Sequence, residues 1–458
     1  MYRLLAAFLV AAPLAIGSAQ SFAQGLTASR AIVIEQVTVI DVETGASHVE
    51  QTVIISGNRI TAVQPTARAH VPAGARIVDG RGKFLIPGLW DMHVHALQHY
   101  GIEYDHWMEA LQLFVANGVT GIRDMGSSLG QLLAGKRRIE SQRLVAPRIF
   151  GSGPLLETAE TSRYGTAVLL LQTPDEGRRA VDSLAVAGVD FLKIHDGLSR
   201  ETYFAIAAEA KRKHMSFAGH VPEGITLVEA SDAGQRSIEH LASLAEACTD
   251  EAEPRTGQVN QPLRVINGAK CDSTLSRLAR NGTFLTPTLL SSVPLTVGSP
   301  GAAESRLRYI KPIERGAFPR LAAEESQGAR ARHEFNELLT RAAAAAKVTI
   351  LAGTDTGAPY RLPGWALQDE LGLLVDAGLS PLEALRSATL NPALYFNMQG
   401  SLGTIAPGKL ADLLLLDGDP LADIHNTSRI AAVIANGRLF DATAIQSMLD
   451  DVLASAHR

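Results

Sequence analysis

Cysteine is almost absent from this sequence, and so is any strong excess of charge. Two cysteines among 458 residues cannot supply the ligands of a cysteine-rich zinc site. A formal net charge of −5, without a long run of like charges, gives no indication of a nucleic-acid or anionic-membrane partner. The two residues, Cys248 and Cys271, lie in a polar stretch. In an exported protein such a pair is expected to form a disulfide.

Long apolar runs are also missing, apart from one near the N-terminus. Arg3 precedes an apolar run over residues 4–16, and these 13 residues are too few to span a bilayer comfortably. Ser21 and Ala23 follow as small residues that suit a signal peptidase. We predict that residues 1–23 are a cleaved signal peptide, with an uncleaved anchor as the alternative. The mature protein is therefore expected to be periplasmic or secreted.

Both ends of the remaining chain have the pattern of short β-strands. Alternating β-branched residues and Gly or Asn turns occur in "AIVIEQVTVIDV" and "EQTVIISGNRITAVQP" near the start. Similar patterns return in "GKLADLLLLDGDP" and "IAAVIANGRLFD" near the end. We predict one small β-sandwich domain built from residues 27–86 and 400–445.

The middle of the chain, residues 87–399, has a different pattern. Short apolar runs alternate with helix-like stretches such as "RETYFAIAAEAKRKH" and "HEFNELLTRAAAAAK". The eight runs are "WDMHVH", "GVTGIRDMG", "RIFGSGPLL", "VDFLKIHDG", "MSFAGHV", "RSIEHL", "TFLTPTLL" and "VTILAGTDTG". Their alternation with helices predicts an α/β fold, a (β/α)8 TIM barrel, whose active site lies at the C-terminal ends of its strands.

Side chains that can bind a metal gather at those predicted strand ends. Two histidines one residue apart point to the same side of a strand, so the first run offers a pair of imidazoles. Together with residues of the fourth, fifth, sixth and eighth runs, they predict a metal site at the mouth of the barrel. The candidate ligands are His93, His95, Lys193, His220, His240 and Asp355.

The order of these residues resembles that of the amidohydrolase superfamily. The lead-in "FLIPGLWDMHVH" and the exit "SATLNPALYFNMQGSLGTIAPGKLADLLLLDGDP" are most similar to exported imidazolonepropionase-like and Xaa-Pro dipeptidase-like members. The resemblance covers nearly the whole mature chain. It implies that His93 and His95 bind one metal ion, and that His220 and His240 bind a second.

The resemblance further implies that Lys193 is carbamylated and bridges the two ions, while Asp355 is both a ligand and the general base. The chemistry of the residues supports this independently. A neutral lysine amine can capture carbon dioxide and become an anionic ligand, and burial beside cations favours the loss of its proton. Two divalent ions that share a water lower its pKa and so supply hydroxide. Zinc is expected, although manganese, iron and cobalt fit the same donors.

Several other polar residues near the predicted strand ends have open roles. His195 is expected to support a ligand rather than bind a metal directly. His99 and His106 either line the pocket or cover its rim. Glu223 gives the His-x-x-Glu spacing that resembles the deaminase branch, which typically uses one metal and lacks the bridging lysine, so Lys193 argues against that branch.

Two further residues are candidates for contact with the substrate. Tyr164 could donate a hydrogen bond to a substrate carbonyl oxygen, although a surface tyrosine is an equal alternative. Arg123 could anchor a substrate carboxylate, or it could form a structural ion pair with Asp124 or another acid.

The leading hypothesis for function is a binuclear metal-dependent amidohydrolase that cleaves a C–N bond in a small dipeptide or N-acyl amino acid. The same site could instead hydrolyse a lactone or phosphotriester, or hold one metal in a deaminase or cyclic-amide hydrolase. A binding protein that kept the barrel without the chemistry is a fourth alternative. The expected partner is a small-molecule substrate. Neither a nucleic acid nor, after signal cleavage, a membrane is expected as a partner. Assembly into a homo-oligomer is an alternative to a monomer.

Overall fold

The computed structural model describes residues 30–97, 107–141, 144–158, 167–250, 265–316 and 318–457. The predicted signal peptide, residues 1–23, lies outside this part of the chain. So do His99, His106 and Tyr164. Among the described helices, none is both long enough and apolar enough to cross a membrane.

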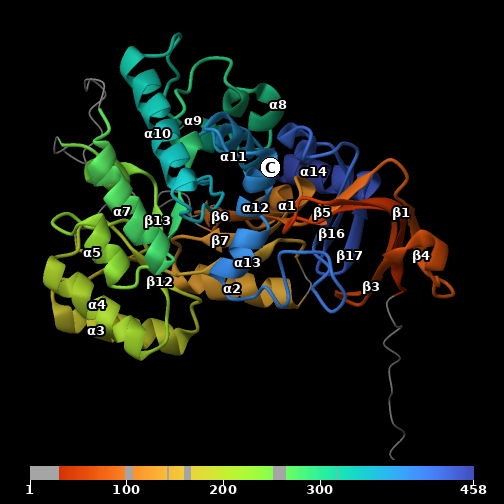
Figure 1. Ribbon diagram of the computed structural model, residues 1–458, viewed down its shortest axis with the longest axis horizontal. Coiled ribbons are helices and arrows are strands. Elements are labelled where there is room, and N and C mark those ends of the chain that lie inside the picture. The colour runs from red at the N-terminus through yellow and green to blue at the C-terminus, as the bar shows by residue number, and fades with distance from the viewer. Residues whose placement is uncertain are drawn as a thin grey trace, which may run out of the picture.

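One mixed sheet takes strands from both ends of the chain, as the sequence predicts (Figure 1). Its order is β17-β16-β15-β5-β1-β2-β3, and β4 pairs with β1. The pairs β1–β4 and β1–β5 are parallel, and the other pairs are antiparallel. The strands are β1 (Ile32–Ile40), β2 (Ser47–Ser56), β3 (Arg59–Pro65), β4 (Arg76–Asp79), β5 (Phe84–Pro87), β15 (Leu413–Leu416), β16 (Ile430–Ala435) and β17 (Arg438–Asp441).

The four leucines of β15 show how this sheet is attached to the rest of the protein. Leu413 and Leu415 belong to an apolar cluster formed by the sheet and its loops alone. Leu414 and Leu416 point to the other face, because side chains alternate along a strand, and they join the large central core. The sheet is therefore buried on both faces at β15, which explains why its sequence is continuously apolar.

The middle of the chain forms two parallel sheets. One has the order β6-β7-β8 and the other β10-β9-β11-β12-β13-β14. The strands are β6 (Leu89–Val94), β7 (Val119–Asp124), β8 (Arg148–Gly151), β9 (Leu155–Glu157), β10 (Val168–Leu170), β11 (Leu192–Ile194), β12 (Phe217–Gly219), β13 (Ser237–Glu239) and β14 (Phe284–Thr286).

Hydrogen bonds join the two parallel sheets into a cyclic order. The segment 349–354 lies between β14 and β6, because the Leu351 N–H donates to Leu285 O (2.9 Å) and the Met92 N–H donates to Ala352 O (2.8 Å). On the other side, β8 pairs with β7 while β9, which follows it directly in the chain, pairs with β11. The eight runs predicted from the sequence thus follow one another around the ring in chain order.

Helices alternate with these strands and surround them (Figure 1). The two quoted helix-like stretches form α4 and α10, each with a serine N-cap, Ser199 and Ser326, whose side chain accepts a backbone hydrogen bond. The helices are α1 (Trp107–Ala116), α2 (Leu129–Glu140), α3 (Pro174–Ala187), α4 (Arg200–Arg212), α5 (Leu227–Asp232), α6 (Ala242–Cys248), α7 (Gly268–Asn281), α8 (Glu304–Leu307), α9 (Pro312–Gly316), α10 (Gln327–Ala345), α11 (Trp365–Asp376), α12 (Pro381–Ser387), α13 (Leu390–Tyr395) and α14 (Ala442–Ala456).

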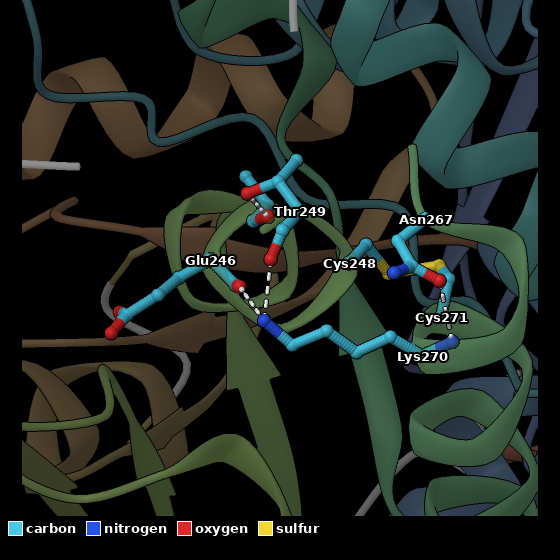
Figure 2. Close-up of a disulfide and its surroundings, with 7 residues drawn as sticks. Glu246, Cys248, Thr249, Asn267, Lys270 and Cys271 are labelled. Atoms are coloured by element: carbon cyan, nitrogen blue, oxygen red, sulfur yellow. Dashed lines mark hydrogen bonds between the residues drawn. A yellow bond between two sulfur atoms is a disulfide. The ribbon is translucent and has the colours of Figure 1, made fainter. Parts of the chain in front are cut away.

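A disulfide between Cys248 and Cys271 joins the end of α6 to the first turn of α7, as predicted (Figure 2). Hydrogen bonds reinforce the same junction. The Asn267 N–H donates to Cys248 O (2.8 Å), and the Asn267 side chain caps α7 by accepting from the Lys270 N–H (3.1 Å). The Lys270 ammonium in turn donates to the Thr249 carbonyl. The two helix ends are therefore held by covalent and polar contacts together.

Candidate metal centre

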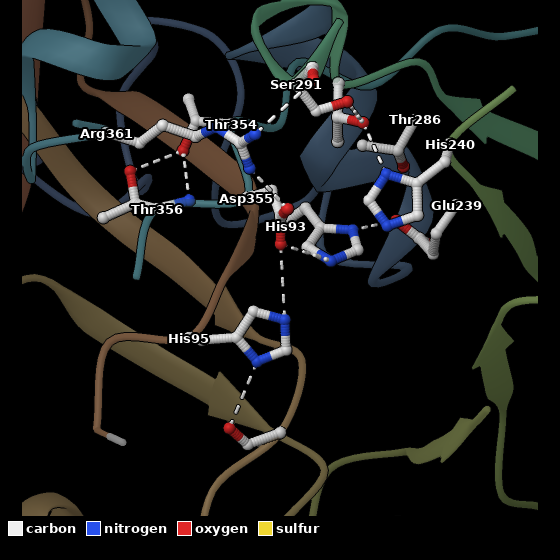
Figure 3. A network of polar contacts seen from close by, with 12 residues as sticks. His93, His95, Glu239, His240, Thr286, Ser291, Thr354, Asp355, Thr356 and Arg361 are labelled. Carbon is white, nitrogen blue, oxygen red and sulfur yellow. Dashed lines mark hydrogen bonds and ion pairs between the residues drawn. The ribbon is translucent and has the colours of Figure 1, made fainter. Parts of the chain in front are cut away.

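Three of the predicted ligands, His93, His95 and Asp355, meet where β6 and the segment 349–354 end (Figure 3). His93 Nε2 lies 3.6 Å from Asp355 Oδ1, and His95 Nε2 lies 3.4 Å from the same oxygen. Ligands of a tetrahedral zinc ion with bonds of about 2.0–2.2 Å lie about 3.3–3.6 Å apart. These three donor atoms therefore fit one metal ion better than they fit direct hydrogen bonds.

Two glycines allow the backbone segments that carry this group to approach each other. A Cβ atom on Gly353 would lie 2.8 Å from the Cβ atom of His93. A Cβ atom on Gly357, where φ is +112°, would lie 2.8 Å from the Cβ atom of His95. The glycines on either side of Asp355 in "AGTDTGA" thus make room for the histidine pair.

The carboxylate of Asp355 is shared between the histidines and a cation. Its Oδ2 accepts a hydrogen bond from Arg361 Nη1 (2.6 Å), while Oδ1 faces the two imidazoles. Burial raises the pKa of Asp355, but the neighbouring His95 imidazole and the Arg361 charge outweigh this effect and hold the pKa well below its usual value. Asp355 is therefore ionised at neutral pH, as a metal ligand or a proton acceptor must be. The sequence analysis did not single out Arg361. Its position six residues after Asp355 is the sequence feature that could have indicated a contact between the two.

Five histidines of the site share one hydrogen-bonding pattern. In each, Nδ1 faces an oxygen atom, and the carbonyl and carboxylate oxygens among these can only accept. Thr288 Oγ1 donates to Pro287 O, so it too is an acceptor toward its histidine. Each Nδ1 is therefore placed to donate a hydrogen bond, and Nε2 is the ring nitrogen that remains for a metal ion in a neutral imidazole. The pairs are His93 with Glu239 (2.8 Å), His95 with Gly126 O (3.4 Å), His195 with Glu157 (2.5 Å), His220 with Asp196 (2.8 Å) and His240 with Thr288 (2.6 Å).

The same five imidazoles form a continuous arc along the strand ends. Successive ring centroids are separated by 5.6 Å, 4.8 Å, 5.0 Å and 4.6 Å. The order along the arc is His95, His93, His240, His220 and His195. The predicted ligands of both metals are thus brought to one place.

Two buried polar atoms of the site have no hydrogen-bond partner among the described residues, Lys193 Nζ and His93 Nε2. Burial lowers the pKa of Lys193 to about 8, although the Glu239 and Asp355 charges oppose this effect. A buried polar atom without a partner carries a cost of about 1–3 kcal/mol unless a ligand satisfies it. Together with the uniform histidine pattern, the two atoms show that this chain's residues fit bound metal ions.

A second group of possible ligands lies at the ends of β11 and β12. It contains His195, Asp196 and His220, and one possible ligand atom from each residue lies within 4.8 Å of the others. His240 belongs to neither three-residue group, but its ring lies between those of His93 and His220. Asp196 was missed in the sequence analysis, although it directly follows His195.

The structure contradicts the prediction that Arg123 anchors a substrate carboxylate. Its guanidinium is fully buried and donates to both oxygens of Glu239 (2.7 and 2.8 Å) and to Ser237 Oγ (2.7 Å). The alternative, a structural ion pair with an acid other than Asp124, is confirmed. Because Glu239 also accepts from His93 Nδ1, Arg123 helps to hold that imidazole in place. Glu223 is exposed beyond β12 and gives no support to the deaminase spacing.

Comparison with known sequences identifies the family. A profile described as the amidohydrolase family matches residues 84–440, which is more than half of the 458 residues. The chain therefore belongs to the amidohydrolase family. The fold of this family implies a (β/α)8 barrel, in agreement with the cyclic order of the parallel strands.

Two relatives differ greatly in the length of their match. An imidazolonepropionase from Rubrobacter xylanophilus is 26% identical over 418 residues, which cover 84% of this chain and 90% of that protein. An adenine deaminase candidate from Picrophilus torridus is 33% identical over only 88 residues, 19% of this chain and 14% of that protein. The likeness to the deaminase is thus confined to a short stretch.

Two solved structures resemble about nine tenths of the chain. A prolidase candidate from Bifidobacterium longum is 25% identical with a TM-score of 0.69, covering 93% of this chain and 99% of that one. A Xaa-Pro dipeptidase with bound methionine in its active site is 23% identical with a TM-score of 0.68, covering 90% of this chain and 100% of that one. At this identity the second likeness shows the shared fold alone.

Proposed function

We propose that this protein is a two-metal hydrolase that cleaves an amide C–N bond in a small dipeptide or N-acyl amino acid. The observation that carries the proposal is the arc of the four predicted histidine ligands beside the buried amine of Lys193, which has no hydrogen-bond partner among the described residues. Membership of the amidohydrolase family supports a metal-dependent hydrolase. We further propose that the site holds two metals, that Lys193 is carbamylated, and that the substrate is an amide.

The residues divide into two ligand sets that share Lys193. His93, His95 and Asp355 would hold the first ion, and His220 and His240 the second. The neutral amine of Lys193 would attack the carbon of carbon dioxide, form an N–C bond and release one proton. The resulting carbamate carries one negative charge shared by two oxygens, and it would serve as an anionic ligand to both sets. Imidazole and oxygen donors of this kind suit zinc, and also manganese, cobalt or iron.

Divalent cations held there would supply Lewis acidity, which lowers the pKa of a water molecule and polarises a carbonyl group. Asp355 is placed to accept the proton of the attacking water, because its carboxylate is ionised and lies at the centre of the first ligand set. The hydrogen bond from Arg361 to Oδ2 keeps the carboxylate in one orientation.

Breaking an amide requires that the departing nitrogen receive a proton. Asp355 would return the proton it has accepted, so that the C–N bond breaks as the N–H bond forms. An ester or lactone has less need of this step, because an alkoxide is a better leaving group than an amide anion. A buried, well-oriented carboxylate therefore supports C–N cleavage above ester hydrolysis.

The comparisons support a small substrate with a C–N bond. A relative that matches 84% of this chain is named imidazolonepropionase, and a similar structure at 25% identity is described as a prolidase candidate. Tyr164 stays a candidate hydrogen-bond donor to the substrate carbonyl. Export to the periplasm or secretion also stays a proposal, and the Cys248–Cys271 disulfide supports it.

The test is a comparison of kcat/KM for the fully metallated enzyme across dipeptides, N-acyl amino acids, lactones and phosphotriesters. We expect a dipeptide or an N-acyl amino acid to be the best substrate. A lactone or phosphotriester that exceeds both by a hundredfold would show that the site serves the alternative chemistry. Elemental analysis of the same preparation should find two divalent ions per chain, and a single ion would favour a mononuclear cyclic-amide hydrolase or deaminase.

A further inference from the structure

One fully buried carboxyl group lies outside the proposed ligand sets but is joined to them by hydrogen bonds. Glu370, in α11, has no exposed surface. Its Oε1 accepts from the Leu289 N–H (2.9 Å), and its Oε2 accepts from the Leu290 N–H (2.8 Å). Burial raises the pKa of Glu370 to about 8, although these two hydrogen bonds lower it. Burying a carboxyl group is costly, and the two backbone contacts offset part of that cost.

The two N–H groups belong to the first turn of a short 3-10 helix, η3 (Leu289–Ser291). Such N–H groups have no partner within their own helix. The residue before η3 is Thr288, and its side chain makes no capping hydrogen bond to the turn. Instead, the Thr288 hydroxyl donates to Pro287 O (2.7 Å). Glu370 therefore caps η3 from a different helix.

Thr288 has a backbone conformation that needs such support. Its φ of +49° and ψ of +53° lie in the left-handed region, which a β-branched residue rarely adopts. A residue keeps these angles only where the surrounding structure holds it. Thr286, two residues earlier, is fixed in β14, and the two residues that follow Thr288 are fixed by Glu370. The strained residue thus lies between two anchored segments.

The Thr288 hydroxyl is the partner of His240, a predicted ligand of the second ion. Its Oγ1 lies 2.6 Å from His240 Nδ1, and the His240 N–H donates to Thr286 O (2.9 Å). By contrast, the Nδ1 partner of His93 is Glu239, which lies within strand β13 and is held by the sheet. Thr288 lies beyond the end of β14, so its position depends on η3.

We infer that Glu370 is a positioning residue for the second cation. By holding η3 it fixes Thr288, and through Thr288 it fixes the imidazole of His240. The inference rests on the proposed function, in which His240 binds that cation. Glu370 is not itself a ligand. The affinity of the second ion, and not that of the first, is therefore expected to depend on the Glu370 carboxyl group.

The test measures metal binding to variants of the full-length chain. Glu370→Met keeps the length of the side chain but removes both acceptors, whereas Glu370→Gln keeps one acceptor oxygen. Metal-free protein is titrated with Zn²⁺ against a chromophoric chelator, and the bound ions are counted by elemental analysis. We expect Glu370→Met to bind the first ion as the wild type does and the second at least about tenfold more weakly, which is the usual effect of losing a residue that supports a metal ligand. Glu370→Gln should restore part of the loss.

A double variant separates positioning from general damage to the fold. Thr288→Ala removes the hydroxyl that contacts His240 and should also weaken the second ion. If Glu370 acts through Thr288, adding Glu370→Met to Thr288→Ala should cause little further loss, because both changes break the same chain of contacts. Hydrogen exchange of the metal-free protein gives a second readout. Residues 287–292 should exchange faster in Glu370→Met than in the wild type.

Glu383→Met is the matched control, because the Glu383 carboxylate also accepts a backbone hydrogen bond, from the Ser380 N–H (2.8 Å), at the exposed start of α12. It should leave both binding steps unchanged. If Glu370→Met does not fold, Glu370→Gln takes its place in the comparison. The inference is wrong, and the proposed function stands, if the wild type binds two ions but the Glu370 variants bind the second with unchanged affinity, or if the losses in the double variant add in full. A wild type that binds only one ion would instead refute the two-metal proposal.

Discussion

Lys193 places an amine in a fully buried position where no described residue accepts its hydrogen bonds. A charged ammonium is costly there, and burial accordingly lowers its pKa to about 8. The neighbouring imidazoles of His93, His220 and His240 are each held in place by a hydrogen bond at Nδ1. At the scale of single residues, the site is thus arranged to bind external cations rather than to stabilise a protonated lysine of its own.

The first prediction concerns the loss of this amine. Lys193→Ala should lower kcat/KM by more than about a hundredfold, because supporting residues alone already account for about 10–100-fold in metal sites. Acetate or propionate added in solution should restore part of the activity by supplying a carboxylate in place of the carbamate. Lys213→Ala, which breaks only a partly exposed pair with Asp182, is the control and should retain activity. Near-normal turnover of Lys193→Ala without added acid would refute the proposed role.

The second prediction concerns the pH dependence of carbamate formation. Only the neutral amine reacts with carbon dioxide, and its fraction rises with pH up to the pKa and levels off above it. With a pKa of about 8 instead of 10.5, the rate should rise through pH 8 and be nearly constant above pH 9. The measurement is the carbamate signal in ¹³C NMR of metal-free protein at a fixed concentration of dissolved ¹³CO₂. A rate that still increases at pH 10 would show that Lys193 titrates like an exposed lysine.

The third prediction concerns the buried ion pair behind His93. Arg123→Met should lower the free energy of unfolding by about 3–5 kcal/mol, because it leaves Glu239 charged and uncompensated in the core. Arg277→Met removes an exposed pair with Asp232 and should cost less than about 1 kcal/mol. Denaturant unfolding of both variants checks the difference. Similar small losses in the two variants would mean that Glu239 is neutral when Arg123 is absent.

The spacing of residues in the sequence indicated the candidate donor residues of the site, but not the residues that hold them in position. His93 and His95 could be found because two residues along a strand is a local distance. Glu239 is 146 residues away from His93 in the chain, and only the closed order of strands brings the two together. Arg123 was a candidate to bind the substrate carboxylate, because the sequence around a single cation does not show which acid pairs with it. Support of this kind depends on long-range packing and has no local signal.

At the scale of elements, seven of the eight predicted runs form strands, the eighth pairs with its neighbours only through isolated bridges, and the third is divided. The run "RIFGSGPLL" forms β8 and β9 with an interruption at residues 152–154. Gly153 has φ of +67° there, and Pro154 has no N–H to donate to a neighbouring strand. The break lets the first half pair with β7 and the second with β11. An apolar run in the sequence predicts a strand, but it does not predict with which neighbouring strand each half pairs.

The fourth prediction concerns the disulfide between α6 and α7. Reduction should lower the free energy of unfolding by about 3 kcal/mol, because the bridge closes a loop with a sequence separation of 23 residues. Mass spectrometry under non-reducing conditions should find no free thiol, and denaturant unfolding with and without reductant gives the stability difference. The double variant Cys248→Ser, Cys271→Ser should be insensitive to reductant. If reductant destabilises this variant as well, the effect does not come from the bridge.

At the scale of the whole molecule, the mixed sheet ties the two ends of the chain to the metal centre. In β5, Leu85 and Ile86 pair with Leu415 and Leu414 of β15, and β5 leads through Gly88 directly into β6. The strand that carries His93 therefore starts from a sheet that is complete only when the last part of the chain is present. The β-rich pattern of both ends could be recognised from the sequence, whereas this pairing could not. The predicted division at residues 86 and 400 stays a prediction.

The fifth prediction tests this dependence with two truncated chains. A chain that ends at residue 408 loses β15, β16, β17 and α14, while one that ends at residue 441 loses α14 alone. The first truncation removes the four leucines of β15, each at most 1% exposed. Burying one leucine contributes about 1.5–3 kcal/mol. Their joint loss is thus comparable with the entire stability of about 5–15 kcal/mol that is usual for a folded protein.

We therefore expect the chain ending at residue 408 to lack a cooperative unfolding transition and to bind no metal ion tightly. The chain ending at residue 441 loses the contact of Val452 with Leu113 but keeps the whole sheet, so it should fold with reduced stability and still bind metal. Thermal unfolding and elemental analysis of both proteins check these outcomes. If the shorter chain retained two ions and a sharp transition, the strand that carries His93 would not need the sheet, and the metal centre would depend on the parallel strands alone.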